Sequence, residues 1–126
     1  MQKQTLKLPN MTKILVTGGV GFIGSHTVVE LIQAGYEPVI IDNLSNSSIN
    51  VLDGIEKITG KRPHFAQIDC QDKAAMAKLI EEQGPIDAII HFAASKAVGE
   101  SVEKPLLYYR NNLVSLLNLL ELMQQY

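Results

Sequence analysis

The sequence has only one cysteine, Cys70, and three histidines that are scattered along its 126 residues. A single cysteine cannot form an internal disulfide, and scattered histidines give no cluster of metal ligands. No apolar run approaches the ~18 residues of a membrane span, and no apolar secretion signal opens the chain. The 11 basic and 13 acidic side chains give a net charge of −2, which argues against a nucleic-acid or membrane-surface partner. We expect one domain in a reducing cytoplasm.

The residues from Lys13 to Asp42 have the pattern of a strand, a glycine turn, a helix and a second strand. The run at 13–17 is apolar and β-branched, which is typical of a strand buried in a sheet. The glycines after it fit both G-x-G-x-x-G and G-x-x-G-x-x-G, and they are Gly18, Gly19, Gly21 and Gly24. Such glycines allow a sharp turn, a close approach of the backbone to a pyrophosphate and tight packing of the next helix. The predicted helix at 22–34 would present free N–H groups to that anion.

Asp42 closes the second predicted strand, at 39–41. Its distance from the glycines is that at which an acid accepts hydrogen bonds from the adenosine ribose of a dinucleotide. The carboxylate favours NAD over NADP, because a 2′-phosphate would meet a negative charge and no arginine follows nearby. Glycine-rich turns also occur in loops that bind nothing, but strand, helix and acid together predict a dinucleotide site.

The rest of the chain alternates between helical and strand patterns. Helices are predicted at 49–59, 73–83 and 105–126, and strands at 64–68 and 86–92. We interpret His91, inside the apolar run at 89–94, as a hydrogen-bonded core histidine. The alternation predicts an incomplete doubly wound parallel sheet of the Rossmann type, with helices on both faces and strand order 3-2-1-4. Residues 1–10 have no period and are expected to be a flexible arm before a domain at 11–126.

Two polar positions have two interpretations each. Asn46 and Ser47, in the loop after Asp42, are candidates for phosphate or adenosine contacts, but both residue types also favour plain turns. Asp69 follows a predicted strand at the sheet edge where parallel sheets bind ligands, and it could instead cap the next helix.

The last predicted helix has an unusually broad apolar surface. Between 113 and 123 only Ser115, Asn118 and Glu121 are polar. One neighbour cannot cover such a surface, so we expect one face on the sheet and another on a second partner. No glycine, asparagine or proline follows Met123, so the helix is expected to continue beyond the chain.

Two sequence blocks resemble the UDP-glucose 4-epimerases. The first is TGGVGFIGSH at 17–26, which by itself is typical of the extended short-chain dehydrogenase/reductase superfamily. The second is HFAASKAVGES at 91–101, followed by KPL at 104–106 and YYRNN at 108–112, and it is more similar to the epimerases than to nucleotide-sugar dehydratases. The resemblance covers residues 11–123.

The resemblance implies NAD as the cofactor and a set of contacts to it. Phe22 and Ile23 would lie at the pyrophosphate, and Asp69 with Cys70 would flank the adenine. The adenosine side would be held by Asp42, Asn43, Leu44, Ser45, Asn46 and Ser47. The path towards the nicotinamide would be lined by Phe92, Ala93, Ala94, Ser95 and Lys96, with Asn111 nearby.

The family inverts the 4-hydroxyl of a UDP-hexose through a 4-keto intermediate, and a tyrosine in a Tyr-x-x-x-Lys pair acts as the base. That pair is absent: the residues four places after Tyr36, Tyr108 and Tyr109 are Ile40, Asn112 and Leu113, and Tyr126 is last. We therefore expect no catalytic residue here and an NAD-binding amino-terminal part that is inactive alone. The UDP-hexose would bind through the missing half, and the family's homodimer would use the last helix. The alternatives are another NAD-dependent nucleotide-sugar dehydratase or reductase, and a non-catalytic nucleotide-binding module.

Overall fold

The computed structural model describes residues 12–45, 47–93 and 102–126. The predicted arm at 1–10 lies outside them, as do the predicted site residues Asn46, Ala94, Ser95 and Lys96. The elements in chain order are β1 (Lys13–Thr17), α1 (Phe22–Gln33), β2 (Glu37–Asp42), α2 (Val51–Thr59), β3 (His64–Gln67), α3 (Lys73–Gln83), β4 (Ala88–His91) and α5 (Pro105–Gln125).

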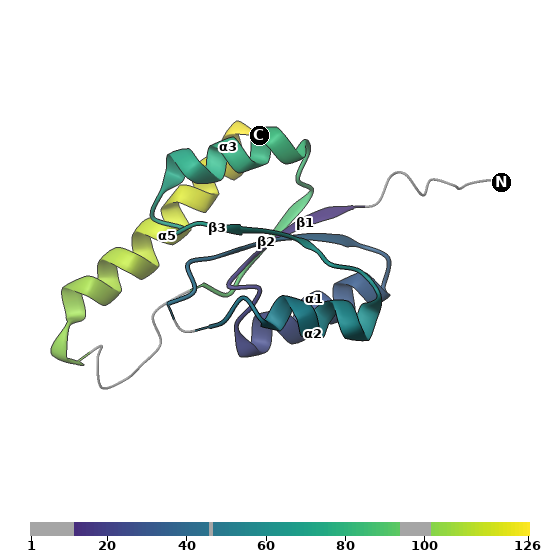
Figure 1. Ribbon diagram of the computed structural model, residues 1–126. Coiled ribbons are helices and arrows are strands. Elements are labelled where there is room, and N and C mark those ends of the chain that lie inside the picture. The colour runs from purple at the N-terminus through teal and green to yellow at the C-terminus, as the bar shows by residue number, and fades with distance from the viewer. Residues whose placement is uncertain (1–11, 46, 94–101) are drawn as a thin grey trace.

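The strands form one parallel sheet in the order β3-β2-β1-β4, which confirms the predicted topology. Leu15 at the centre of β1 is in register with Val39 of β2 and with Ile89 of β4. Helices α1 and α2 cover one face of the sheet, and α3 and α5 cover the other (Figure 1). Parallel strands need such crossover helices, and the helices bury both faces of the sheet.

Alternate residues of the strands pack into two separate hydrophobic cores, one on each face of the sheet. On the α1 and α2 side, Ile14, Val16 and Ile40 pack with apolar residues of both helices. On the α3 and α5 side, Leu15 and Ile41 pack with apolar residues of those helices. Side chains alternate between the faces of a strand, so a run that is apolar at every position fits a sheet covered on both sides.

Several element ends differ from the sequence prediction because pairing and turns extend or shorten the regular part. β2 begins at Glu37 rather than residue 39, since the Glu37 amide donates to the carbonyl of Thr12 at 2.9 Å. β4 spans only Ala88–His91, although the Asp87 and Phe92 amides still donate to β1 carbonyls. β3 ends at Gln67, and α2 begins at Val51 after a turn.

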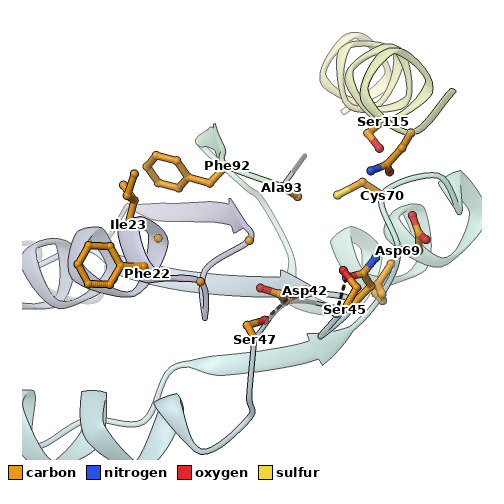
Figure 2. Close-up of a pocket in the computed structure, with 16 residues that line it drawn as sticks. Phe22, Ile23, Asp42, Ser45, Ser47, Asp69, Cys70, Phe92, Ala93 and Ser115 are labelled. Atoms are coloured by element: carbon orange, nitrogen blue, oxygen red, sulfur yellow. Dashed lines mark hydrogen bonds between the residues drawn. The ribbon is translucent and has the colours of Figure 1, made fainter. Parts of the chain in front are cut away.

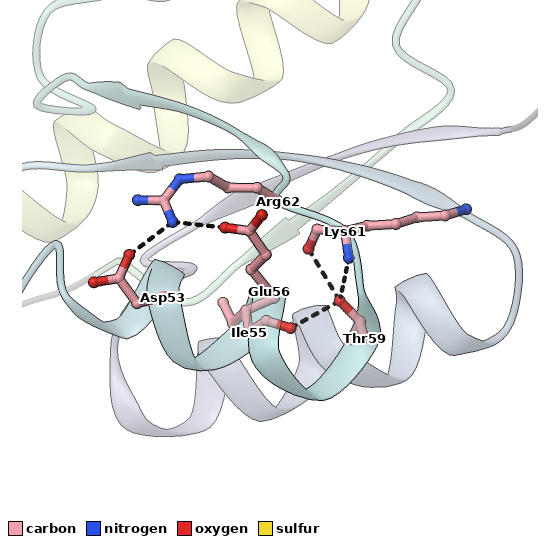
Figure 3. A network of polar contacts seen from close by, with 6 residues as sticks. All are labelled: Asp53, Ile55, Glu56, Thr59, Lys61 and Arg62. Atoms are coloured by element: carbon pink, nitrogen blue, oxygen red, sulfur yellow. Dashed lines mark hydrogen bonds and ion pairs between the residues drawn. The ribbon is translucent and has the colours of Figure 1, made fainter.

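An exposed polar network joins the end of α2 to the chain that leads into β3 (Figure 3). Arg62 donates to Asp53 at 2.8 Å and to Glu56 at 3.1 Å. The Thr59 hydroxyl donates to the carbonyl of Ile55 and accepts from the amide of Lys61. The bond to Asp53 and, after it, the bond to Glu56 raise the pKa of Arg62. Exposed ion pairs contribute little stability, so the network mainly orients the loop.

Helix α5 is half covered, as its sequence predicts. Its buried residues are Tyr108, Ser115, Asn118, Leu119 and Leu122. Its exposed large apolar residues are Leu106, Leu107, Tyr109, Leu113, Leu116, Leu117, Leu120 and Met123. In the described ranges, no helix has the length and apolar character needed to cross a membrane. Nor do the described residues include a group of three His, Cys, Asp or Glu side chains that could hold a metal ion.

Candidate functional site

A cavity of about 500 Å³ lies at the carboxyl ends of the strands. This is the edge at which open parallel sheets bind ligands, and the volume is within the range of small-molecule sites. Figure 2 shows its walls. The lining residues are Gly18, Gly21, Phe22, Ile23, Gly24, Asp42, Asn43, Ser45, Ser47, Ile68, Asp69, Cys70, Phe92, Ala93, Asn111 and Ser115. Apart from Leu44, every predicted site residue that the structure describes is among them.

The glycine turn forms one wall and leaves no room for side chains. Gly18 has a positive φ of 71°, and a Cβ there would lie 2.9 Å from the amide nitrogen of Ala93. A Cβ on Gly24 would lie 2.1 Å from the carbonyl oxygen of Gly18. Gly21 precedes α1 without a side-chain cap, so the first-turn amides of α1 are left for another acceptor. These are the conditions under which a helix N-terminus binds an anion.

Asp42 ends β2 at the middle of the cavity and is 8% exposed. Its Oδ1 accepts from the Leu44 amide at 2.9 Å and from the Ser47 hydroxyl at 3.2 Å. Within the described residues, its Oδ2 has no hydrogen-bond donor. The loop therefore holds the carboxylate through one oxygen and leaves the other for a ligand.

Asp69 lines the cavity beyond Asp42, and it does not cap α3. Its Oδ1 accepts from the Gln71 amide at 2.8 Å. The cap of α3 is Asp72, whose Oδ1 accepts from the Ala75 amide at 3.1 Å. Of the two interpretations of Asp69, the helix cap is therefore wrong. The ligand contact stays a prediction, and Asp69 is one of the residues that line the cavity.

Cys70 lies at the base of the same wall and is tied to α5. The Asn118 side chain donates to the carbonyl of Cys70 at 2.9 Å, and Gln71 donates to Oδ1 of Asn111 at 3.2 Å. Both bonds hold the loop after β3 against α5. Burial raises the pKa of the Cys70 thiol to about 12, and the charges of Asp69 and Asp42 add to the effect.

Thr17, which is fully buried, organises the end of the cavity near Phe92. Its hydroxyl is hydrogen-bonded to Nδ1 of His91 at 2.6 Å and accepts from the Ala93 amide at 3.1 Å. His91 is hydrogen-bonded, as predicted, but it is half-buried rather than part of the core. This network fixes the chain after β4 beside the glycine turn.

Two lining residues, Ile68 and Ser115, were not predicted. Ser115 had a visible signal, because it is polar within an apolar run and stands four residues after Asn111, on the same face of a helix. Leu44 is a predicted site residue that does not line the cavity, and its contact to the cofactor stays a prediction. Its φ is +62°, its amide donates to Asp42, and its side chain packs with the core on the α1 and α2 side.

The chain is similar in sequence to known proteins. The model of the family described as GDP-mannose 4,6 dehydratase matches residues 15–126. UDP-glucose 4-epimerase 2 of Arabidopsis thaliana is 53% identical over 116 residues, which are 90% of this chain and 33% of that protein. UDP-glucose 4-epimerase of Bacillus subtilis is 53% identical over 113 residues, again 90% of this chain and 33% of that protein.

A solved structure extends the similarity to the fold. The crystal structure of UDP-glucose 4-epimerase from Bifidobacterium longum, in complex with NAD+ and UDP, has a TM-score of 0.87 and 49% identity. The match covers 90% of this chain and 34% of that one. The chain thus spans about a third of the length of the curated relatives that it matches.

The buried thiol of Cys70 predicts a loss of stability at high pH. Its pKa is raised from the ordinary 9.0 to about 12 in the folded chain, so between these values the unfolded chain loses the thiol proton first. The folded state then binds more protons, and its stability falls as the pH rises through this window. Urea unfolding of the parent between pH 8 and about 10.5 should show this fall. In Cys70→Ala the free energy of unfolding should fall less over the same pH range. An identical pH dependence in both proteins would contradict the prediction.

Proposed function

Because the chain belongs to the family described as GDP-mannose 4,6 dehydratase, we propose that it is the NAD-binding part of a UDP-glucose 4-epimerase. The observation that carries the proposal is the single cavity that joins the glycine turn, Asp42 and Asp69. These groups come from the ends of three neighbouring strands, and their chemistry changes along the cavity in the order of the parts of a dinucleotide.

The residues present fit NAD from the pyrophosphate to the adenine. The glycine turn would hold the pyrophosphate. The backbone at Gly18 and at Gly24 lies so close to its neighbours that a Cβ would not fit, so the amides of the turn stay open to an anion. Phe22 and Ile23 lie on the same wall, with 83% and 58% of their surface exposed. They would cover the pyrophosphate, and Asp69 with Cys70 would flank the adenine.

Asp42 would accept hydrogen bonds from the adenosine ribose through its Oδ2. Asn43, Ser45 and Ser47 lie around it in the cavity, and the hydroxyl of Ser47 already binds Oδ1 of Asp42. A buried carboxylate repels a 2′-phosphate, and this supports NAD rather than NADP.

Phe92 and Ala93 would line the path towards the nicotinamide, with Asn111 nearby and Ala94, Ser95 and Lys96 continuing it. NAD bound at these residues would supply the acceptor and donor of the hydride. The chain's own task would be to orient the cofactor against the substrate. The Tyr-x-x-x-Lys pair that supplies the base in epimerases is absent from this sequence. We propose that the UDP-hexose is bound by sequence outside these residues.

The relatives favour an epimerase over the dehydratase reaction in the family's description. Two UDP-glucose 4-epimerases, from a plant and a bacterium, are each 53% identical to the chain over 90% of its length. We propose reversible inversion at C4 of a nucleotide sugar, in galactose metabolism and in the cytoplasm, as the activity of the whole protein.

We also propose that α5 forms a homodimer contact. Tyr109, Leu113, Leu116, Leu117 and Leu120 are at least 43% exposed, and their spacing places them along one side of the helix. A continuous apolar stripe of this kind is typical of an interface.

Asp42→Ala should weaken NAD binding by about 1 to 3 kcal/mol, because it removes charge-assisted hydrogen bonds to the ribose. Isothermal titration of the 126-residue chain with NAD measures the change. Asp53→Ala is the matched control, since it removes the same charge from the exposed surface of α2 and should leave the affinity unchanged. Equal titration curves for Asp42→Ala and the parent would remove Asp42 from the site.

The 126-residue chain alone should show no epimerase activity, even with NAD bound. Loss of a general base costs about 10²- to 10⁴-fold in rate, and lost positioning of the hexose multiplies this. A coupled assay of UDP-glucose formation from UDP-galactose and NAD tests it, with the Bacillus subtilis enzyme as positive control. Turnover comparable to that enzyme would show that catalytic groups lie among the residues assigned to binding.

Leu117→Glu should weaken self-association at least about tenfold, because a dimer would bury an unpaired carboxylate. Sedimentation over a range of concentrations measures the association. Ile58→Glu is the control: Ile58 is 65% exposed on α2, across the sheet from α5, and its change should leave the dimer intact. A parent chain that is monomeric at every concentration would refute the contact.

A further inference from the structure

Ser115 is a buried polar residue that faces the cavity from α5. It is 2% exposed, yet it is one of the residues that line the cavity. Its hydroxyl forms no hydrogen bond with any residue that the structure describes. A buried hydroxyl without a partner is costly, so such a group needs an explanation.

The other serine and threonine side chains of the described helices behave differently. Ser25 donates to the carbonyl of Phe22 at 3.0 Å, and Thr27 to that of Ile23 at 3.2 Å. Thr59 donates to the carbonyl of Ile55 at 2.8 Å. Such back-bonding is the usual way in which a helix satisfies a serine or threonine. Ser115 forgoes it, although it is more deeply buried than these three residues.

The strand order identifies the part of a ligand that would meet Ser115. β2, which carries Asp42, lies between β1 and β3, and the loop after β3 carries Asp69 and Cys70. A nucleotide with its phosphates on the turn after β1 and its ribose at Asp42 therefore extends its base towards β3. Figure 2 shows Ser115 above Cys70, at the end of the cavity opposite Phe22 and Ile23.

The chemistry of this end suits a flat base with polar edges. Ile68 and Cys70 contribute apolar surface, Asp69 a carboxylate and Ser115 a hydroxyl. The bond from Asn118 to the Cys70 carbonyl joins this wall to α5, so Ser115 is held in place. Each ring nitrogen of adenine that bears no hydrogen is an acceptor that a serine hydroxyl can satisfy.

We propose that the Ser115 hydroxyl donates a hydrogen bond to a ring nitrogen of the adenine base and so helps to select that base. The inference rests on the proposed function, because it assumes an adenine nucleotide in this cavity. It adds a base contact from α5 to those expected from the loops after β2 and β3.

The test compares the parent chain, Ser115→Ala and the control Thr59→Ala by isothermal titration and thermal unfolding. The ligands are NAD, ADP and ADP analogues in which one base nitrogen at a time is replaced by C–H. Ser115→Ala should bind NAD and ADP about two- to tenfold more weakly, the effect of one neutral hydrogen bond. Without ligand its melting temperature should not fall, because no protein hydrogen bond is lost. Thr59→Ala should show the opposite pattern, with a lower melting temperature and unchanged affinity.

For the parent chain, one analogue should have a lower affinity than ADP, by the same two- to tenfold factor. For Ser115→Ala, that analogue and ADP should have equal affinities. Unchanged affinity of Ser115→Ala for NAD and ADP would overturn the proposal and leave the proposed function intact. A weakening that no analogue reproduces would overturn the base contact, and a lower melting temperature without ligand would show a structural role instead. A parent chain that binds neither NAD nor ADP would overturn the proposed function together with this inference.

Discussion

The site depends on a backbone contact in which α1 meets the turn after β1. Gly24 approaches the carbonyl of Gly18 so closely that a Cβ would lie 2.1 Å from its oxygen. The same turn is bound to the neighbouring strand, because the Gly18 amide donates to the carbonyl of Ile41 at 2.8 Å. Ile41 directly precedes Asp42. The start of α1 and the backbone of Asp42 are therefore set at a fixed spacing by main-chain contacts, and the bonds from Leu44 and Ser47 then orient the carboxylate.

The opposite wall is assembled by side chains instead. Asn118 and Asn111 of α5 reach the loop after β3 across separations of 48 and 40 residues. Both bonds join amide side chains to groups that water would otherwise satisfy, so each stabilises the fold modestly. Their main effect is on position, since they hold Asp69 and Cys70 against the helix that carries Ser115. The cavity thus has one wall of backbone and one wall of side chains.

This difference explains how much of the site could be predicted from the sequence. Glycine spacing and the acid after β2 are local patterns within one strand–helix–strand unit, and their predicted places lie in the cavity. Alternating apolar runs likewise predicted the four strands and their order, since right-handed crossovers leave few other arrangements. Ser115 and Ile68 were missed because their place depends on how α5 lies on the sheet, which apolar periodicity does not specify. Leu44 is not among the lining residues, since its side chain packs with the core on the α1 and α2 side, and its contact to the cofactor stays a prediction.

The strand order also has a consequence for the path of folding. β1 pairs on one side with β2, which follows it in the sequence after a single helix. On the other side it pairs with β4, which lies much further along the sequence. The Thr17 to His91 bond closes a separation of 74 residues, about three times that of the β1–β2 pair, which costs about 1 kcal/mol more in chain entropy. We therefore expect β1 and β2 to pair first and the strand that leads to Phe92 and Ala93 to dock later. Thr17 joins β1 to the end of β4, so on this order the end of the cavity near Phe92 would be the last to form.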